Sequence, residues 1–409
     1  MLRLSAIRRA LTALAGLVFP SIAGAQTPVE PMIPLFHQWH WKPAPETVKK
    51  VVAGAPGTKR VQFVVLMLGE LDEAKRVRRW GTVWDPPETA TDKAPKPIFQ
   101  PFTPEMRATI CRWLTDAFRA ATKAGLEISV LCQVDAADTG AVQDWRNFFD
   151  FDPTVTLEGG SYESAVLGPV VEALDAATPK GSSVELAVEG EMGRTLFTHP
   201  TAWRKIVERL KSAPGHEKWR VGISANYENV AGGVKPDASP APDRQALVAA
   251  ADFVGLSCYA KAGLPPTVAD FTACVETFAA EWTAAGCPLP AGKPLRFTEL
   301  GLGGGGFDAD WKLQIPAPLI DRMGKAAFFG TDDPAKNPWA DQARIGYRRA
   351  WHHAALEFLT EKRTPWPIAS AFLWSFASHD IHGFERPAFR DDAIVEDVRK
   401  HNDTVRVKR

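Results

Sequence analysis

The chain has 409 residues, in which 48 Lys and Arg are balanced by 48 Asp and Glu. This balance argues against nucleic acids and anionic membranes as partners, because both attract surfaces with excess positive charge. The length is usual for one large barrel domain with long loops. Fourteen Trp stand against four Tyr. Trp has a flat apolar face that can stack on a sugar ring, although most are expected in the core.

The first 25 residues have the layout of a cleavable signal peptide. Arg3, Arg8 and Arg9 precede the apolar run 10–19, and small residues at 23–25 offer a cleavage site. The Arg8-Arg9 pair loosely suggests the twin-arginine route. The apolar run is too short to span a bilayer, and no later segment approaches the roughly 20 apolar residues required. We expect a periplasmic or secreted protein of residues 26–409, slightly acidic, monomeric and not bound to a membrane.

Five Cys is an odd number for an exported protein. At least one thiol therefore stays free unless it pairs between chains, and no disulfide framework is implied. Cys274 and Cys287 flank one predicted helix, which leaves a bond between them open.

Eight short apolar runs alternate with amphipathic helical stretches. Alternation of this kind predicts a parallel α/β architecture, and eight strand–helix pairs fit a closed barrel better than an open sheet. No early GxGxxG turn supports a doubly wound sheet. The expected fold class is α/β, a single (β/α)8 TIM barrel with long βα loops. The predicted strands are residues 33–36, 61–68, 127–132, 184–188, 221–224, 253–258, 295–298 and 368–374.

Helices are expected between these strands, and two long insertions interrupt the pattern. Thr103 is a candidate N-cap for the longest early helix. The insertions 69–102 and 302–341 begin where strands end, so both are expected on the C-terminal face, where active sites of such barrels lie. The predicted helices are residues 104–124, 162–177, 201–212, 244–251, 267–285 and 343–362.

Acidic residues follow the fourth and seventh predicted strands. By strand alternation Glu185, Glu189 and Glu191 are expected to face the barrel lumen, and Glu299 ends the seventh strand. Two carboxylates facing each other across a barrel mouth suit a retaining glycosidase. One acid protonates the leaving oxygen, while the other carboxylate attacks the anomeric carbon from about 5 Å away.

A structural explanation for these two glutamates stays open. Glu191 or Glu299 could simply pair with an arginine such as Arg194 or Arg296. If they are catalytic, the general acid should be the carboxyl whose pKa is raised by apolar surroundings or by the charge of the other.

Several motifs occur in an order that resembles a known family. They are Pro101-Phe102-Thr103-Pro104-Glu105, Asp144-Trp145-Arg146, Val188-Glu189-Gly190-Glu191-Met192, Ser224-Ala225-Asn226-Tyr227, Phe297-Thr298-Glu299-Leu300-Gly301 and Phe372-Leu373-Trp374. In this order, from the first strand to the eighth, the chain resembles clan A glycoside hydrolases, and within them the β-mannanase-like barrels of family 113.

The resemblance implies a retaining β-glycoside hydrolase acting on β-mannan or another β-glycan. Glu191 would be the acid/base and Glu299 the nucleophile, with Tyr259 hydrogen-bonded to the nucleophile and Trp374 as the floor of the sugar site. No metal or other cofactor is implied, and the only partner is the carbohydrate substrate. Further substrate contacts are expected from Asn226, Asp135, His37, Trp39 and Trp145.

Gly190 departs from the family pattern. Clan A barrels usually carry Asn just before the acid/base Glu, and that Asn contacts the sugar 2-hydroxyl. Its replacement by Gly means that another residue makes the contact, that the sugar differs at C2, or that activity is lost. The last case is the rival interpretation, an inactive exported barrel that binds glycan.

Four histidines suggest a third interpretation. His37 and His40 follow the first strand, and His379 and His382 follow the eighth, its neighbour in a closed barrel. With Asp380 they could hold a transition metal, as in metal-dependent barrel hydrolases. Otherwise one or two of them bind sugar hydroxyls and the others are structural.

Overall fold

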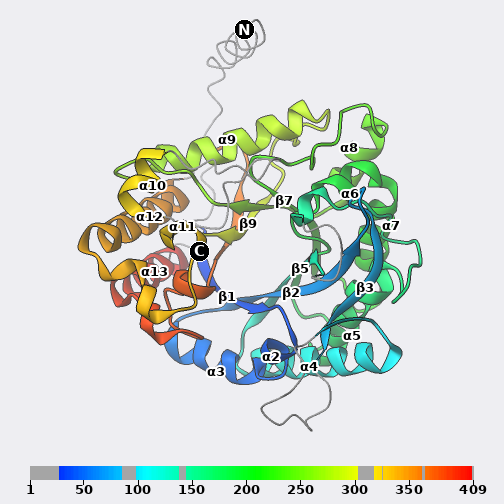
Figure 1. Cartoon of the computed structure of the whole chain (residues 1–409), viewed down its shortest axis with the longest axis horizontal. Coiled ribbons are helices and arrows are strands. Elements are labelled where there is room, and N and C mark those ends of the chain that lie inside the picture. The colour runs from blue at the N-terminus through cyan, green and yellow to red at the C-terminus, as the bar shows by residue number, and fades with distance from the viewer. Residues whose placement is uncertain are drawn as a thin grey trace, which may run out of the picture.

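The computed structural model describes residues 27–84, 98–137, 144–302, 317–324, 326–361 and 364–407. The predicted signal peptide and parts of both predicted insertions lie outside these residues. Eight parallel strands close into a barrel in the order β1-β2-β5-β6-β7-β8-β9-β10, and β10 returns to β1 (Figure 1). The predicted TIM barrel is confirmed. Its strands are β1 (Val29–Leu35), β2 (Arg60–Leu71), β5 (Glu127–Ala136), β6 (Val184–Ala187), β7 (Trp219–Asn226), β8 (Val254–Cys258), β9 (Leu295–Leu300) and β10 (Ile368–Leu373).

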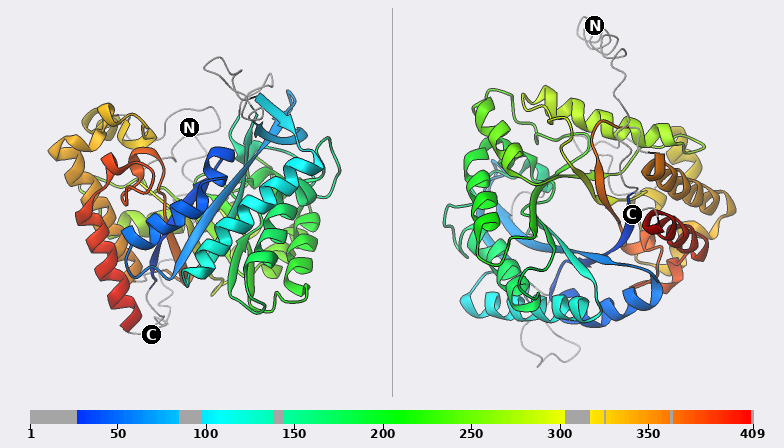
Figure 2. Two further views of the ribbon diagram at one scale, coloured as in Figure 1. Left: turned by 90° about the horizontal axis from the view of Figure 1, so that it is seen from below. Right: turned by 180° about the vertical axis from the view of Figure 1, so that it is seen from behind.

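Helices surround the barrel as an outer ring (Figures 1 and 2). The predicted N-cap is present, since the Thr103 hydroxyl accepts a hydrogen bond from the Met106 N–H at 3.2 Å. This bond satisfies one of the free N–H groups at the start of the helix. The helices are α2 (Gln38–Trp41), α3 (Ala44–Gly54), α4 (Pro104–Lys123), α5 (Gly168–Ala177), α6 (Gly193–Thr198), α7 (Pro200–Ser212), α8 (Ala241–Ala250), α9 (Val268–Ala284), α10 (Ala317–Met323), α11 (Ala326–Phe329), α12 (Gln342–Glu361) and α13 (Asp392–Val407).

The first insertion contains strands that the sequence did not predict. The antiparallel strand β3 (Val77–Trp84) pairs with the extended end of β2, and β4 (Ile98–Pro101) pairs with β3. Trp80 anchors this extension, because its buried ring packs edge-on against Phe151 and Tyr162 at centroid distances of 4.9 and 5.6 Å. The strands extend past one end of the barrel (Figure 2, left), so they raise one wall of its mouth.

The barrel lumen is filled in layers. A salt bridge joins Glu185 on β6 to Arg296 on β9 at 2.7 Å, and Arg60 on β2 also pairs with Glu185. The Arg296 guanidinium lies over the ring of Phe253, 4.0 Å from its centroid. An apolar layer continues the packing towards the C-terminal ends of the strands. It consists of Met32, Val64, Leu131, Ala187, Phe253 and Phe372.

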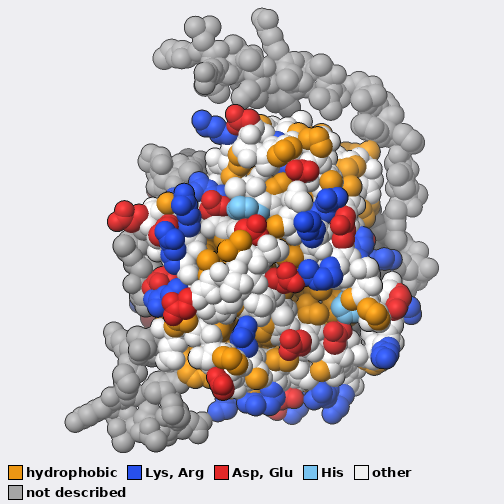
Figure 3. Space-filling model, turned by 90° about the vertical axis from the view of Figure 1, so that its right-hand side faces the viewer, with side chains coloured by type: hydrophobic (Ala, Val, Ile, Leu, Met, Phe, Trp, Pro, Cys, Tyr) orange, Lys and Arg blue, Asp and Glu red, His pale blue; other side chains and the backbone are white. Residues whose placement is uncertain are grey.

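The described surface shows no marked segregation of charge in the view of Figure 3. Lys and Arg side chains are intermixed with Asp and Glu over this face, which is the right-hand side of Figure 1. Among the described helices, none has the length and apolar character needed to cross a membrane.

The structure does not bring Cys274 and Cys287 together, so the bond left open between them is not formed here. The Cys274 sulfur lies 3.2 Å from that of Cys258 on β8. Cys287 is instead close enough to Arg244 for that charge to act on its thiol. The helix α9 turns Cys274 inward onto the barrel, whereas Cys287 follows the end of the helix, and sequence spacing alone does not reveal this difference.

The ion pairs of Glu185 lead to a stability prediction. Replacing Glu185 by Ala leaves Arg60 and Arg296 buried without their shared partner, so the free energy of unfolding should fall by about 3–5 kcal/mol in urea titrations. Glu127→Ala is the matched control. It removes the other, half-exposed partner of Arg60 and should cost about 1 kcal/mol or less. Equal losses in both variants would contradict a structural role for the lumen pair.

Candidate active site

Glu299 lies at the C-terminal end of β9, and its carboxylate is held at both oxygens. The Gln133 amide on β5 donates to Oε1 at 2.6 Å, and the Tyr259 hydroxyl just after β8 donates to Oε2. Glu299 is only 2% exposed. Two donors from separate strands fix the carboxylate in one orientation, as a nucleophile requires.

Glu191 lies four residues beyond the end of β6 and carries an unusual backbone. Its φ is +62°, a left-handed conformation that non-glycine residues rarely adopt. The Glu191 N–H donates to the Ser224 carbonyl at 3.0 Å, which ties this turn to β7. Strained backbone that the surroundings enforce is concentrated at functional sites. From this backbone conformation the Glu191 carboxylate accepts a hydrogen bond from Arg146.

Arg146 joins two carboxylates in the barrel mouth. Its Nη1 donates to Glu191 Oε2 at 2.7 Å, and its Nε donates to Asp135 Oδ1 at 3.0 Å. Glu191 therefore does pair with an arginine, as the structural explanation supposed, but that arginine is Arg146 and neither of the two named from the sequence. Arg194 donates to the Gly232 carbonyl, and Arg296 is the partner of Glu185.

The two glutamates are coupled electrostatically. Burial, and then the charge of Glu191, raise the pKa of Glu299 to about 8, against the lowering effects of Tyr259, Arg146 and Gln133. Glu299 therefore keeps its proton at neutral pH. A raised pKa was expected on the acid/base residue, Glu191, but the raised value falls on Glu299. The Arg146 guanidinium directly contacts Glu191 and not Glu299, so no contacting cation offsets the burial of Glu299.

The Glu189 carboxylate is buried and is not available to a substrate at the barrel mouth. Strand β6 ends at Ala187, so the alternation that predicted a lumen-facing side chain stops before residue 189. Its oxygens accept the N–H groups of Ser224 at 2.7 Å and Met192 at 3.1 Å, and the residue has no exposed surface. Burial raises the pKa of Glu189 to about 8. Its role is to connect the end of β6 to β7.

Gly190 is explained by its neighbours on β5. A Cβ at this position would lie 2.8 Å from Leu131 Cδ1 and 2.9 Å from Gln133 Cγ. The space of the Asn that clan A barrels usually have is thus filled by a side chain from the next strand. Gln133 was missed in the sequence, although it lies on the same face of β5 as Leu131 and Asp135, which is a signal that could have identified it.

Trp374 and Tyr259 meet beside Glu299. Their rings are edge-on with centroids 6.4 Å apart. A Cβ on Gly301 would come within 2.9 Å of both side chains, so only glycine allows the chain after β9 to pass between them. The half-buried Trp374 ring also lies 6.2 Å from Phe36 after β1. Tyr259 thus contacts Glu299, and Trp374 lies beside Tyr259.

The other predicted contacts are spread around the same rim. Asn226 ends β7 and is 5% exposed. Asp135 ends the face of β5 that carries Gln133, and its carboxylate is engaged by Arg146. Trp145 is half-buried, with its ring edge-on to Phe148 at 5.7 Å.

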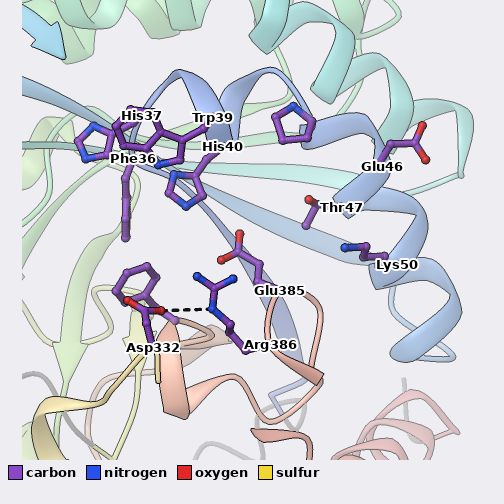
Figure 4. Close-up of a pocket in the computed structure, with 12 residues that line it drawn as sticks. Phe36, His37, Trp39, His40, Glu46, Thr47, Lys50, Asp332, Glu385 and Arg386 are labelled. Atoms are coloured by element: carbon purple, nitrogen blue, oxygen red, sulfur yellow. Dashed lines mark ion pairs between the residues drawn. The ribbon is translucent and has the colours of Figure 1, made fainter. Parts of the chain in front are cut away.

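A cavity of about 500 Å³ adjoins the mouth on the side of β1 and β10 (Figure 4). Trp39, which is 45% exposed, and His37 lie on one side, with their rings tilted and their centroids 4.7 Å apart. Phe36 and Phe376 line the side towards Trp374. Glu191 and Glu299 are not among the residues that line it. The polar residues of the cavity include His40, Thr47, Lys50, Glu385 and Arg386, with Arg386 paired to Asp332 at 3.4 Å.

The four histidines do not converge. Within the described part of the chain, no group of three or more His, Cys, Asp or Glu is arranged to hold a metal ion. His37 and His40 border the cavity, whereas His382 stacks on Phe384 at 4.6 Å and lies beside Val29 at the start of β1. Burial lowers the pKa of both His379 and His382 to about 3. The loop after β10 folds these two away from the mouth, which the sequence did not show.

Comparison with known proteins gives a likeness of overall fold. No protein-family model and no curated protein matches the sequence. A solved family 113 β-1,4-mannanase is 11% identical, with 93% of this chain and 99% of that chain covered and a TM-score of 0.48. The family 113 β-mannanase of Alicyclobacillus acidocaldarius is 14% identical over the same shares, with a TM-score of 0.47. A family 5 protein of Streptomyces cattleya is 11% identical, with 94% and 82% covered and a TM-score of 0.45.

These solved structures are glycoside hydrolases of the families that the sequence resembles. The barrel itself is established by the strand order of this chain. At such low identities the likeness concerns the fold, and the chemistry of this chain has to be argued from its own residues.

The close contacts of Gly190 predict that an alanine at this position destabilises the protein. Gly190→Ala should lower the free energy of unfolding by about 1–3 kcal/mol, because Leu131 and Gln133 must move. Gly346→Ala is the control, since its Cβ meets nothing within 4 Å on α12 and should stabilise by about 0.5–1 kcal/mol. Urea unfolding measures both. An unaffected Gly190→Ala protein would contradict the packing described.

The raised pKa of Glu299 predicts a pH-dependent stability. The unfolded carboxyl loses its proton near pH 4.5 and the folded one near 8, so the folded state holds more protons between these values. Stability should therefore fall as pH rises from 5 to 8, with Glu299 contributing on the order of a few kcal/mol.

Glu299→Gln tests this assignment. Its amide can still accept from Gln133 and donate to Tyr259, but it does not titrate. The loss of stability between pH 5 and pH 8, followed by thermal unfolding, should be smaller than in the wild type. The same loss in both proteins would show that Glu299 is not the responsible group.

Proposed function

We propose that the chain is a retaining β-glycoside hydrolase acting on a β-linked oligosaccharide or polysaccharide. The observation that carries the proposal is the pairing of two buried glutamates from opposite sides of the barrel mouth. Glu299 is fixed by Gln133 and Tyr259, and Glu191 is near enough for its charge to raise the pKa of Glu299. A pair of interacting carboxyl groups is the apparatus that double displacement uses.

In this mechanism Glu299 attacks the anomeric carbon while Glu191 gives a proton to the departing glycosidic oxygen. Glu191 then takes a proton from water, which releases the sugar from Glu299. For the first step Glu191 must carry a proton, and the Glu299 carboxyl must be ionised. The Arg146 contact opposes this, so we propose that sugar binding draws the guanidinium towards Asp135, its other partner.

Substrate contacts follow from the layout of the rim. We assign the sugar at the reacting position to the face of Trp374, with Tyr259 orienting the nucleophile and Asn226 on the β7 side. His37 and Trp39 in the adjoining cavity would bind a further sugar of the same chain. Trp145 and Asp135 would border the opposite side. β-Mannan is the first candidate substrate, and another β-glycan is the second.

Export completes the proposal. Residues 1–25 have the sequence features of a signal peptide. A polysaccharide is too large to enter the cytoplasm, so an enzyme that cleaves it has to be periplasmic or secreted. We propose that the mature protein acts there as a monomer and needs no cofactor.

One observation favours a second candidate function. The Arg146 ion pair stabilises a charge on the residue that must act as an acid, and a barrel locked in this state would bind glycan without cleaving it. The two candidates differ in turnover and not in binding.

Activity measurements on a panel of β-glycans distinguish them. Glu191→Gln and Glu299→Gln should each lower kcat/KM by about 10³-fold or more, because each removes a group that takes part in bond cleavage. Glu127→Gln, on the half-exposed start of β5, is the control and should keep wild-type activity. Reducing-sugar release and calorimetric binding are measured together. Binding without turnover by the wild type would favour the glycan-binding barrel, and activity that survives both substitutions would refute the catalytic pair.

A further inference from the structure

The thiols of Cys258 and Cys274 form a contact that the proposed function does not use. Their sulfur atoms lie 3.2 Å apart, and neither side chain has exposed surface. Cys258 is the last residue of β8, and Cys274 faces it from α9, the helix that follows this strand. A disulfide requires the sulfurs to approach to about 2.05 Å, so closing the bond needs a movement of about 1 Å.

We propose that Cys258 and Cys274 are joined by a disulfide when the protein folds in an oxidising compartment. The two thiols lose two protons and two electrons as the sulfur–sulfur bond forms. The electrons pass by thiol–disulfide exchange to a disulfide donor, either a protein thiol oxidase or oxidised glutathione, which is reduced to two thiols. Cys111, Cys132 and Cys287 stay reduced.

Because both thiols are buried in the folded barrel, we expect the disulfide to form during folding and not afterwards. Burial raises the pKa of the Cys274 thiol, and only the thiolate attacks a disulfide. In the folded barrel the donor also has no path to either sulfur. A chain that folds under reducing conditions should therefore keep both thiols even when an oxidant is added later.

The bond would secure a part of the candidate active site. Cys258 directly precedes Tyr259, whose hydroxyl donates to Glu299. The Cys258 carbonyl also accepts the N–H of Gly301 at 3.2 Å, just beyond the end of β9. A link from Cys258 to α9 therefore fixes the backbone that positions both Tyr259 and the turn after the nucleophile strand.

Mass spectrometry of the wild type tests the proposal directly. The protein is denatured, reduced and refolded with reduced and oxidised glutathione, then denatured again and alkylated with iodoacetamide. We expect three of the five thiols to be labelled, and a digest to yield one peptide pair joined through Cys258 and Cys274. Five labelled thiols, or a bond to Cys287, would overturn the proposal. The readout needs no enzymatic activity, so it stands apart from the proposed function.

Variants and thermal unfolding provide the second arm. Cys287→Ser should keep the cross-link and show two labelled thiols, whereas Cys258→Ser and Cys274→Ser should each show four. The closed loop is short, so the wild type folded without oxidant should melt roughly 3–6 °C below the cross-linked protein. A cross-link that persists in Cys258→Ser would also contradict the assignment.

Discussion

The proposed behaviour of the barrel mouth depends on one guanidinium, which lies between the buried carboxylate of Glu191 and the half-exposed carboxylate of Asp135. Arg146 contacts Glu191 and Asp135 and also lowers the pKa of Glu299. Burial nevertheless raises the pKa of Glu299 to about 8. The chemistry proposed requires Glu299 to lose its proton and Glu191 to carry one when a sugar binds, and the half-exposed Asp135 offers the guanidinium another partner.

The geometry of the site depends on close approaches that only glycine allows. Gly190 leaves room for Leu131 and Gln133, and Gly301 leaves room for Trp374 and Tyr259. The first of these changes the meaning of the departure from the family pattern. Gln133 from β5 lies in the space beside position 190 and donates a hydrogen bond to Glu299. Packing against β5 therefore accounts for the glycine at this position.

The sequence predicted the barrel well because each parallel strand is buried on both faces and appears as an apolar run bounded by turns. All eight predicted runs became barrel strands. It failed at β3, where the apolar anchors Trp80 and Trp84 are interrupted by charged and small residues. It also failed for Glu189, since alternation holds only while the strand continues. The sequence also did not show that His37 and His382 lie apart, or that Cys274 contacts Cys258. Both depend on how loops and helices pack around the barrel, which local patterns do not encode.

The positions of Glu191 and Glu299 were predictable because both follow strands whose ends meet at one face of the barrel. The raised pKa of Glu299 was not predictable, since it depends first on burial and then on groups from other parts of the chain, among them Arg146. The most direct test of the central claim is to trap the covalent intermediate. An activated 2-deoxy-2-fluoro-β-glycoside is incubated with the wild type, and the labelled peptide is located by mass spectrometry. The proposal predicts one glycosyl group on Glu299, and a label on any other residue would contradict it.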